Sequence, residues 1–296
     1  MASQNEPVII YGMDHSPWVQ TVLMTCHFYS VPYRLMSRQL SFANYRRAGM
    51  IMPEVRFPDG RIVGDSFEIM REITGRYGLA SADSLVQTED ISRLERLFFS
   101  YALRRGQSGR RMAFIRGWSK APSTDGSLSA SSYRALMCSY FFALILAGRQ
   151  QALRTGFDPD HSETLLRLLK GWESRLGDDP FLDGPEPGLT DLALMGHIQC
   201  MATGLTDDVL AEVKRFPMLR AWAEEMSRRL DTYPHNFARR LVEPGFEPRR
   251  ATLGEAATFW ATGLIGLACL PVSLVVLGDA FRRRESNPNR SGERLR

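Results

Sequence analysis

The first eighty residues alternate short apolar runs with segments of helical periodicity. Val8 to Tyr11 is an apolar run, and Ser16-Pro17 then opens a segment with apolar residues at positions i, i+3, i+4 and i+7. Ser is a favourable N-cap, and Pro fits the first helical position, where its missing N–H would be unpaired anyway. The pattern predicts a strand, a helix and, over Tyr33 to Met36, a second strand.

A hairpin and another helix are predicted next. Glu54 to Phe57 and Arg61 to Val63 flank the turn-forming sequence Pro58-Asp59-Gly60. Asp65-Ser66 then opens a helix, with Glu68 three residues after Asp65 as in a capping box. The first part of the chain is thus predicted to be β-α-β followed by β-β-α.

From Thr88 onward the periodicity is helical. Apolar residues recur at spacings of three and four in five segments, 90–104, 135–148, 162–176, 191–202 and 217–230. Residues 119–132 are rich in Ser, Gly and Pro, which predicts a loop. We expect two domains, an α/β domain over 6–80 and an all-α domain over 88–240.

One segment near the C-terminus differs from everything before it. Residues 256–278 carry no formal charge, and Arg282, Arg283 and Arg284 follow them. At about 1.5 Å per residue such a helix would reach roughly 34 Å, enough to cross a hydrocarbon core of roughly 30 Å. We expect a transmembrane or membrane-inserted helix over 255–280, after a linker at 241–254 and before a basic, disordered tail at 281–296.

A helix buried in the fold or in a dimer interface is the alternative for this segment, because Gly263, Gly266 and Pro271 interrupt it. Its length, the arginines at both ends and Phe259-Trp260 near one end favour the membrane. Arginines on both sides leave the orientation open. Since no apolar signal segment occurs at the N-terminus, we expect the globular part to be cytoplasmic.

Composition argues against several other classes of protein. The chain has 296 residues, 44% hydrophobic and 24% charged, which suits one large core or two modest ones. Its four cysteines are widely spaced, so neither a disulfide framework nor a metal site is expected. The net charge of +4 is spread along the chain without a basic block, which argues against nucleic acid as a partner.

The order of several motifs resembles that of the cytosolic glutathione transferase superfamily. The resemblance covers residues 8–233 and rests on these segments taken together: Tyr11 to Val19, Met52-Pro53-Glu54-Val55, Asp65-Ser66, Phe181 to Gly184 leading to Gly188-Leu189-Thr190-Asp191, and Phe216 to Trp222. It implies a thioredoxin-like N-terminal domain that binds glutathione, an all-α domain that binds a second substrate, and a homodimer.

The resemblance also implies a clamp for the glutathione peptide. In this family a cis bond before Pro, here Pro53, turns the backbone of Met52 toward the ligand, where it can pair with the cysteinyl part like one more strand. Asp65 and Ser66 would hold the γ-glutamyl end at a helix start, where free N–H groups favour an anion. From the residues alone, both would be N-terminal caps and nothing more.

The thiol of glutathione has a pKa of about 8.5, so the protein must stabilise the thiolate. Ser16 occupies the place of a catalytic Cys or Ser in the family, although a plain N-cap explains it equally well. Tyr11 matches a strand-end tyrosine that other classes use, and its plainer role is a core aromatic. His15 adjoins the thiol and could tune it or contact a second substrate. Met13 departs from the family, since many serine-type members carry their catalytic Ser there.

Two functions are open at this stage. The leading one is a membrane-anchored glutathione transferase, in which the thiolate attacks an apolar electrophile without a metal or further cofactor. The alternative is a non-catalytic scaffold or adaptor at a membrane. Met13 favours the alternative, and so does Gly188, which replaces the usual Ser or Thr cap three residues before the folding determinant Asp191.

Overall fold

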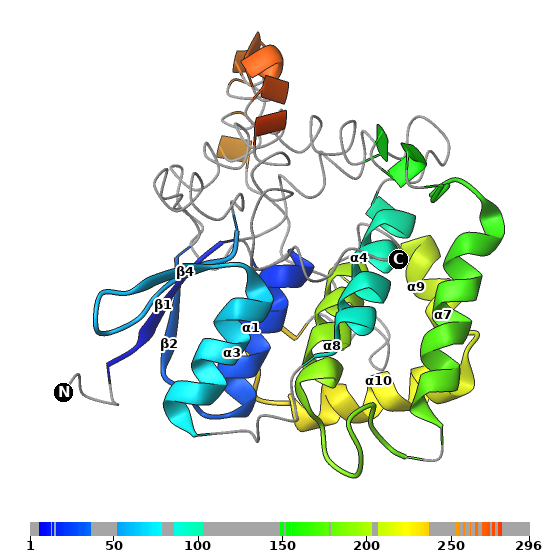
Figure 1. The fold of residues 1–296 in the computed structure, drawn as a ribbon, viewed down its shortest axis with the longest axis horizontal. Coiled ribbons are helices and arrows are strands. Elements are labelled where there is room, and N and C mark those ends of the chain that lie inside the picture. The colour runs from blue at the N-terminus through cyan, green and yellow to red at the C-terminus, as the bar shows by residue number, and fades with distance from the viewer. Residues whose placement is uncertain are drawn as a thin grey trace.

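The structure is a computed structural model of the chain, in which a small sheet with two helices lies beside a group of helices (Figure 1). It describes residues 6–12, 14, 16–36, 52–78, 86–102, 149–150, 152–154, 156–177, 179–202 and 207–236, together with scattered positions between 253 and 279. The predicted helix at 135–148, the loop at 119–132, the tail at 281–296 and all but the last two residues of the linker at 241–254 lie outside the described residues.

Four strands form one mixed sheet: β1 (Val8–Tyr11), β2 (Tyr33–Met36), β3 (Glu54–Arg56) and β4 (Ile62–Gly64). Their order is β2-β1-β3-β4; β1 is parallel to β2 and antiparallel to β3, and β3 is antiparallel to β4. The helix α1 (Pro17–Phe28) joins β1 to β2, because parallel neighbours need a crossover. The predicted β-α-β followed by β-β-α is confirmed, with α3 (Ser66–Tyr77) as its last helix.

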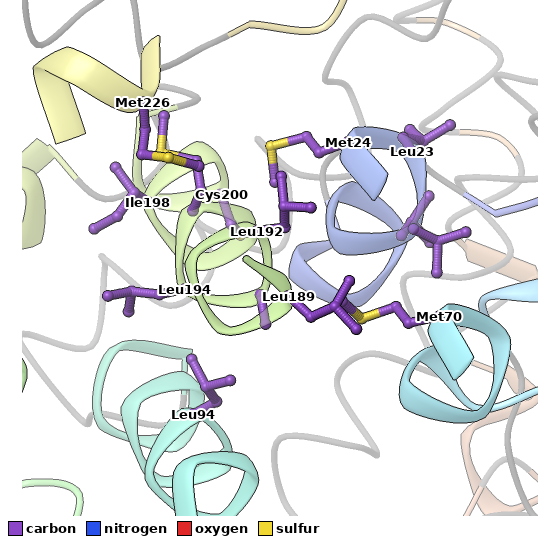
Figure 2. Close-up of a cluster of buried hydrophobic side chains, with 14 of the residues drawn as sticks. Leu23, Met24, Met70, Leu94, Leu189, Leu192, Leu194, Ile198, Cys200 and Met226 are labelled. Atoms are coloured by element: carbon purple, nitrogen blue, oxygen red, sulfur yellow. The ribbon is translucent and has the colours of Figure 1, made fainter. Parts of the chain in front are cut away.

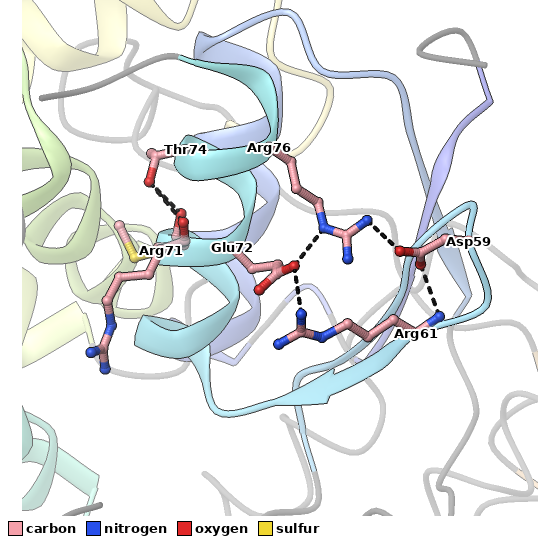
Figure 3. Close-up of polar contacts among 7 residues, drawn as sticks. Asp59, Arg61, Arg71, Glu72, Thr74 and Arg76 are labelled. Carbon is pink, nitrogen blue, oxygen red and sulfur yellow. Dashed lines mark hydrogen bonds and ion pairs between the residues drawn. The ribbon is translucent and has the colours of Figure 1, made fainter. Parts of the chain in front are cut away.

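Polar contacts on the outer face of α3 fix the hairpin to that helix (Figure 3). Arg76 pairs with Asp59 of the turn at 2.6 Å and with Glu72 at 2.5 Å, and Glu72 also pairs with Arg61 at 3.2 Å. The turn itself is closed by the Arg61 N–H, which donates to Asp59 Oδ1 at 2.9 Å. The hairpin turn is therefore held against the C-terminal half of α3.

The helical part contains α4 (Thr88–Ala102), α7 (Ser162–Leu176), α8 (Leu189–Met201), α9 (Asp207–Val213) and α10 (Pro217–Arg229). Four of these were predicted to within two residues at each end. The pattern did not predict α9, because its seven residues span barely two turns.

α8 lies at the centre of the core, and every one of its residues is buried. Figure 2 shows its apolar side chains among those of the surrounding helices: Leu23 and Met24 of α1, Met70 of α3, Leu94 of α4 and Met226 of α10. At Gly196 the backbones come so close that an added methyl group would lie 2.6 Å from the Pro17 carbonyl oxygen. The helical part therefore packs directly against the first turn of α1.

No helix in the described part of the chain is long and apolar enough to cross a membrane. Of the 23 residues in the predicted segment at 256–278, 11 lie outside the described residues.

Candidate functional site

The register of the sheet brings three predicted segments to one edge. Tyr11 pairs with Glu54, and Glu54 pairs with Gly64. The chain that follows Tyr11, the chain that precedes Glu54 and the chain that follows Gly64 therefore leave the sheet side by side. These three segments carry Ser16, Met52-Pro53 and Asp65-Ser66, in that order.

The Met52-Pro53 peptide bond is cis, as expected. Pro53 is buried and Met52 is half-buried. Met52 stands two residues before the first paired residue of β3, so its backbone N–H and C=O lie just beyond the ladder between β1 and β3. An extended ligand backbone could add to the sheet at this point.

The N-terminus of α3 is capped by the side chain of its N-cap residue, Asp65. Asp65 Oδ1 accepts from the Phe67 N–H at 3.0 Å and the Glu68 N–H at 3.5 Å, so the predicted N-cap is confirmed. Asp65 has a φ of 75°, an uncommon value for a residue other than Gly. Such positions concentrate at functional sites. Both Asp65 and Ser66 are buried.

The α1 start is built differently. Ser16 is the N-cap in an extended conformation and is buried, but its side chain makes no capping hydrogen bond. Its carbonyl oxygen accepts from the Gln20 N–H at 2.9 Å, and Pro17 occupies the first helical position. A hydroxyl donor at a helix N-terminus suits a nearby anion, because the helix dipole adds to the hydrogen bond.

The other thiol-site candidates are less informative. Tyr11 ends β1 and is half-buried, while Met13 and His15 lie outside the described residues. Cys26 is buried in α1, and burial raises the pKa of its thiol far above the ordinary range, which makes the thiol unreactive.

An aromatic group adjoins the α1 start. The Trp18 ring packs 5.9 Å from Phe67 of α3, 6.1 Å from Phe98 of α4 and 4.8 Å from His197 of α8. Trp18 and Phe98 are half-buried, so they present apolar surface beside Ser16. His197 is buried, and burial lowers its pKa to about 4, so the imidazole is neutral near pH 7.

Asp191 is the polar centre of the α8 start. It accepts hydrogen bonds from the Leu182 N–H at 2.8 Å, the Gly188 N–H at 3.0 Å and Trp222 Nε1 at 2.8 Å. Burial raises the pKa of this carboxyl, although these hydrogen bonds oppose the shift. Its role is to hold the segment before α8, in keeping with the predicted folding determinant.

Asp183 supplies the cap that Gly188 lacks. Its Oδ2 accepts from the Thr190 N–H at 2.8 Å, and it occupies the space that a side chain at Gly188 would need. Gly188 alone predicted a weakened capping motif at the α8 start, which the Asp183 carboxylate restores. An acceptor five residues away was missed because its place depends on the turn between them.

A group of polar residues that the sequence did not predict lies at the α1 start: Asp14, Gln20, Tyr233 and His235. His235 Nδ1 lies 3.4 Å from Asp14 Oδ2, and the Tyr233 hydroxyl donates to Gln20 Oε1 at 2.7 Å. More than two hundred positions separate the partners, so no local pattern marks them. Among the described residues, no three His, Cys, Asp or Glu side chains are arranged to hold a metal ion.

Comparison with known proteins gives weak likenesses. No family model matches the chain, and no curated protein matches it. A mutant of poplar glutathione transferase F1 is 17% identical, covers 79% of this chain and 99% of its own, and has a TM-score of 0.46. Glutathione S-transferase III in its apo form is 17% identical over 82% of this chain and 100% of its own, with a TM-score of 0.44.

A glutathione transferase homologue from Drosophila mojavensis, solved with bound glutathione, is also 17% identical. It covers 80% of this chain and 94% of its own, with a TM-score of 0.46. Likenesses at this level assign no activity to this chain.

Proposed function

We propose that this protein is a membrane-anchored glutathione transferase that joins glutathione to an apolar electrophile. The observation that carries the proposal is the register that brings Ser16, Met52 and Asp65-Ser66 to one edge of the sheet. Two of these three segments are helix starts, which attract negatively charged groups. Glutathione offers such groups together with an extended backbone that can pair with a strand.

Each segment has a distinct task in this proposal. The Met52 backbone pairs with the cysteinyl part of glutathione, and Asp65 and Ser66 hold its γ-glutamyl end. The Ser16 hydroxyl donates to sulfur and, with the helix dipole, lowers the pKa of the bound thiol below about 8.5. The thiol proton leaves to solvent. The thiolate then forms a bond to the electrophilic carbon, and the leaving group departs with its bonding electron pair.

The second substrate is apolar in this proposal. Trp18 and Phe98 come from the two parts of the chain and present half-buried aromatic surface beside Ser16. Retention of the full-length protein on immobilised glutathione, followed by a thiol-conjugation assay with an aromatic electrophile, tests both halves of the proposal. A protein that is neither retained nor active would be the non-catalytic scaffold instead.

The clamp has its own test. The double variant Asp65→Ala with Ser66→Ala should weaken glutathione binding by at least about tenfold, because charge-assisted hydrogen bonds are lost. Asp59→Ala is the matched control. Asp59 also accepts a backbone N–H, but it lies in the exposed hairpin turn away from this edge. Equal binding by the double variant and the parent would refute the clamp.

We propose that the uncharged C-terminal segment, residues 256–278, anchors the protein in a membrane, with the globular part in the cytoplasm. Its described residues stand apart from the labelled helices in Figure 1, and none of those from 257 to 279 is buried. Leu264, Ile265, Val272 and Val275 expose between 59 and 71% of their surface. So much exposed apolar surface argues against a core helix and supports a bilayer or another protein as its cover.

Fractionation tests the anchor. The full chain should sediment with membranes and resist high-salt and carbonate washes, whereas a chain that ends after Glu247 should be soluble. A full chain that is soluble without detergent would point to a dimer helix. We also propose the homodimer that the family resemblance implies, and sedimentation of the truncated chain tests it separately.

A further inference from the structure

The segment after α10 reaches the loop that precedes α1. This segment, residues 231–236, is held in place by Asn236, whose Nδ2 donates to the Leu230 carbonyl at 3.0 Å and to the Ser227 carbonyl at 3.2 Å. Its Oδ1 accepts from Gln199 of α8 at 3.1 Å. The segment is therefore a fixed part of the helical half, and what it contacts is held by that half.

Two contacts of Asp14 lead back to this segment. Its carboxylate pairs with His235, with 3.4 Å between Oδ2 and Nδ1. Its carbonyl oxygen accepts from Gln20 Nε2, and Gln20 Oε1 accepts from the Tyr233 hydroxyl at 2.7 Å. The Gln20 backbone N–H donates to the Ser16 carbonyl, so one residue ties Asp14, Ser16 and Tyr233 together.

All four side chains of this group are withdrawn from solvent. Asp14, Gln20, Tyr233 and His235 expose 6% of their surface or less. Buried polar groups keep their partners because an unpaired one is costly, so the geometry of such a network is well defined. A defined geometry at Asp14 fixes the backbone two residues before Ser16.

We propose that Asp14 and His235 are positioning residues for Ser16, acting with Gln20 and Tyr233, so that the helical half aims the Ser16 hydroxyl at the glutathione sulfur. The inference rests on the proposed function. Ser16 needs such support because its side chain makes no capping bond that would orient it locally. A donor displaced by about 1 Å loses much of its effect on the reacting atom.

The segment also offers a matched control. Thr232 Oγ1 lies 3.2 Å from His27 Nε2, near the opposite end of α1 from Ser16. Thr232→Val removes a contact between the same segment and the same helix without touching the Asp14 loop. His235→Gln keeps a polar side chain able to donate to Asp14, whereas His235→Leu does not. Tyr233→Phe removes only the hydroxyl that binds Gln20.

The experiment uses the full-length protein in detergent and measures the pKa of the bound glutathione thiol, kcat, and Kd for glutathione. His235→Leu should raise the thiol pKa and lower kcat by roughly tenfold or more, with Kd within about twofold because the clamp is on other elements. Tyr233→Phe should do the same to a smaller extent. His235→Gln should recover most of the loss, and Thr232→Val should match the parent.

Amide hydrogen exchange in residues 12–20 supplies a readout independent of glutathione. It should be faster in His235→Leu and Tyr233→Phe than in the parent and Thr232→Val. Should the parent fail to bind glutathione, the proposed function is wrong, and exchange still decides whether the network orders this loop. Parent-like exchange, thiol pKa and kcat in folded His235→Leu or Tyr233→Phe would overturn the positioning role. Loss of kcat in Thr232→Val to the same degree would do so as well.

Discussion

The two helix starts at the sheet edge meet the same need in opposite ways. At α3 the N-cap residue caps the helix with its own side chain, because the Asp65 carboxylate accepts from two N–H groups of the first turn. At α1 the Ser16 side chain makes no capping bond, and the loop before it is held by Tyr233 and His235. One start is self-contained, and the other depends on the helical half.

This difference separates stability from chemistry. At α3 the Asp65 carboxylate is both the cap and part of the proposed clamp, so changing it should cost stability as well as binding. The Ser16 side chain carries no cap, so changing it should affect the chemistry alone. A substitution in the helical half should therefore alter the structure of the α1 start and leave the α3 start unchanged.

Acid should disturb the α1 start through His197, which packs on Trp18. Burial lowers the pKa of His197 to about 4, from an ordinary 6.5. Between these values the unfolded chain binds the proton and the folded chain does not, so the free energy of unfolding falls as pH drops through this window. At about 1.36 kcal/mol per pKa unit, the full loss is roughly 3 kcal/mol.

Denaturant unfolding at several pH values measures this slope. His197→Gln should flatten it between about pH 6.5 and about pH 4, since the variant has no imidazole to protonate. Hydrogen exchange in acid should rise at the α1 start before it rises at the α3 start. An unchanged slope in the variant would mean that other groups cause the acid sensitivity.

Methyl groups added to the two helix neighbourhoods should have opposite effects. Gly196→Ala pushes against the Pro17 carbonyl oxygen, so it should destabilise the protein by about 1–3 kcal/mol and weaken conjugation. Gly75→Ala in α3 meets nothing within 4 Å and should stabilise by about 0.5–1 kcal/mol, because Ala is the better helix former. Thermal unfolding of both variants measures the two changes in stability. Equal effects would show that the close contact between α1 and α8 does not limit the side chain at Gly196.

Asp65→Ala should cost about 1 kcal/mol, because the Phe67 and Glu68 N–H groups lose their acceptor. Asp65→Gly should cost less, since Gly accepts the φ of 75° without strain. Asp65→Asn should cost least. Denaturant unfolding gives the order, and a larger loss for Gly than for Ala would show that backbone conformation is unimportant here.

The same contrast explains what could be predicted from the sequence. Strands and helices carried by local periodicity, such as Tyr33–Met36 and Ser162–Leu176, were predicted to the residue. So was the Asp65 cap, because donor and acceptor are two and three residues apart. The supports of Ser16 were not, because Gln20 and Tyr233 lie 213 positions apart in the chain. Helix α9 and the cap by Asp183 were not predicted either. The helix is too short to show a helical periodicity, and the cap depends on a turn and not on a repeating pattern.

Ser16→Ala should change the free energy of unfolding least of all, by less than about 0.5 kcal/mol, because no capping bond is lost. It should still raise the pKa of bound glutathione and slow conjugation roughly tenfold or more, since one donor to the thiolate disappears. Tyr11→Phe is the matched control, because it removes a hydroxyl from the end of the neighbouring strand, and it should do less on both counts. An ultraviolet titration of the bound thiolate ranks the two variants. The reverse ranking would move thiol activation to Tyr11 and leave Ser16 as the plain start of a helix.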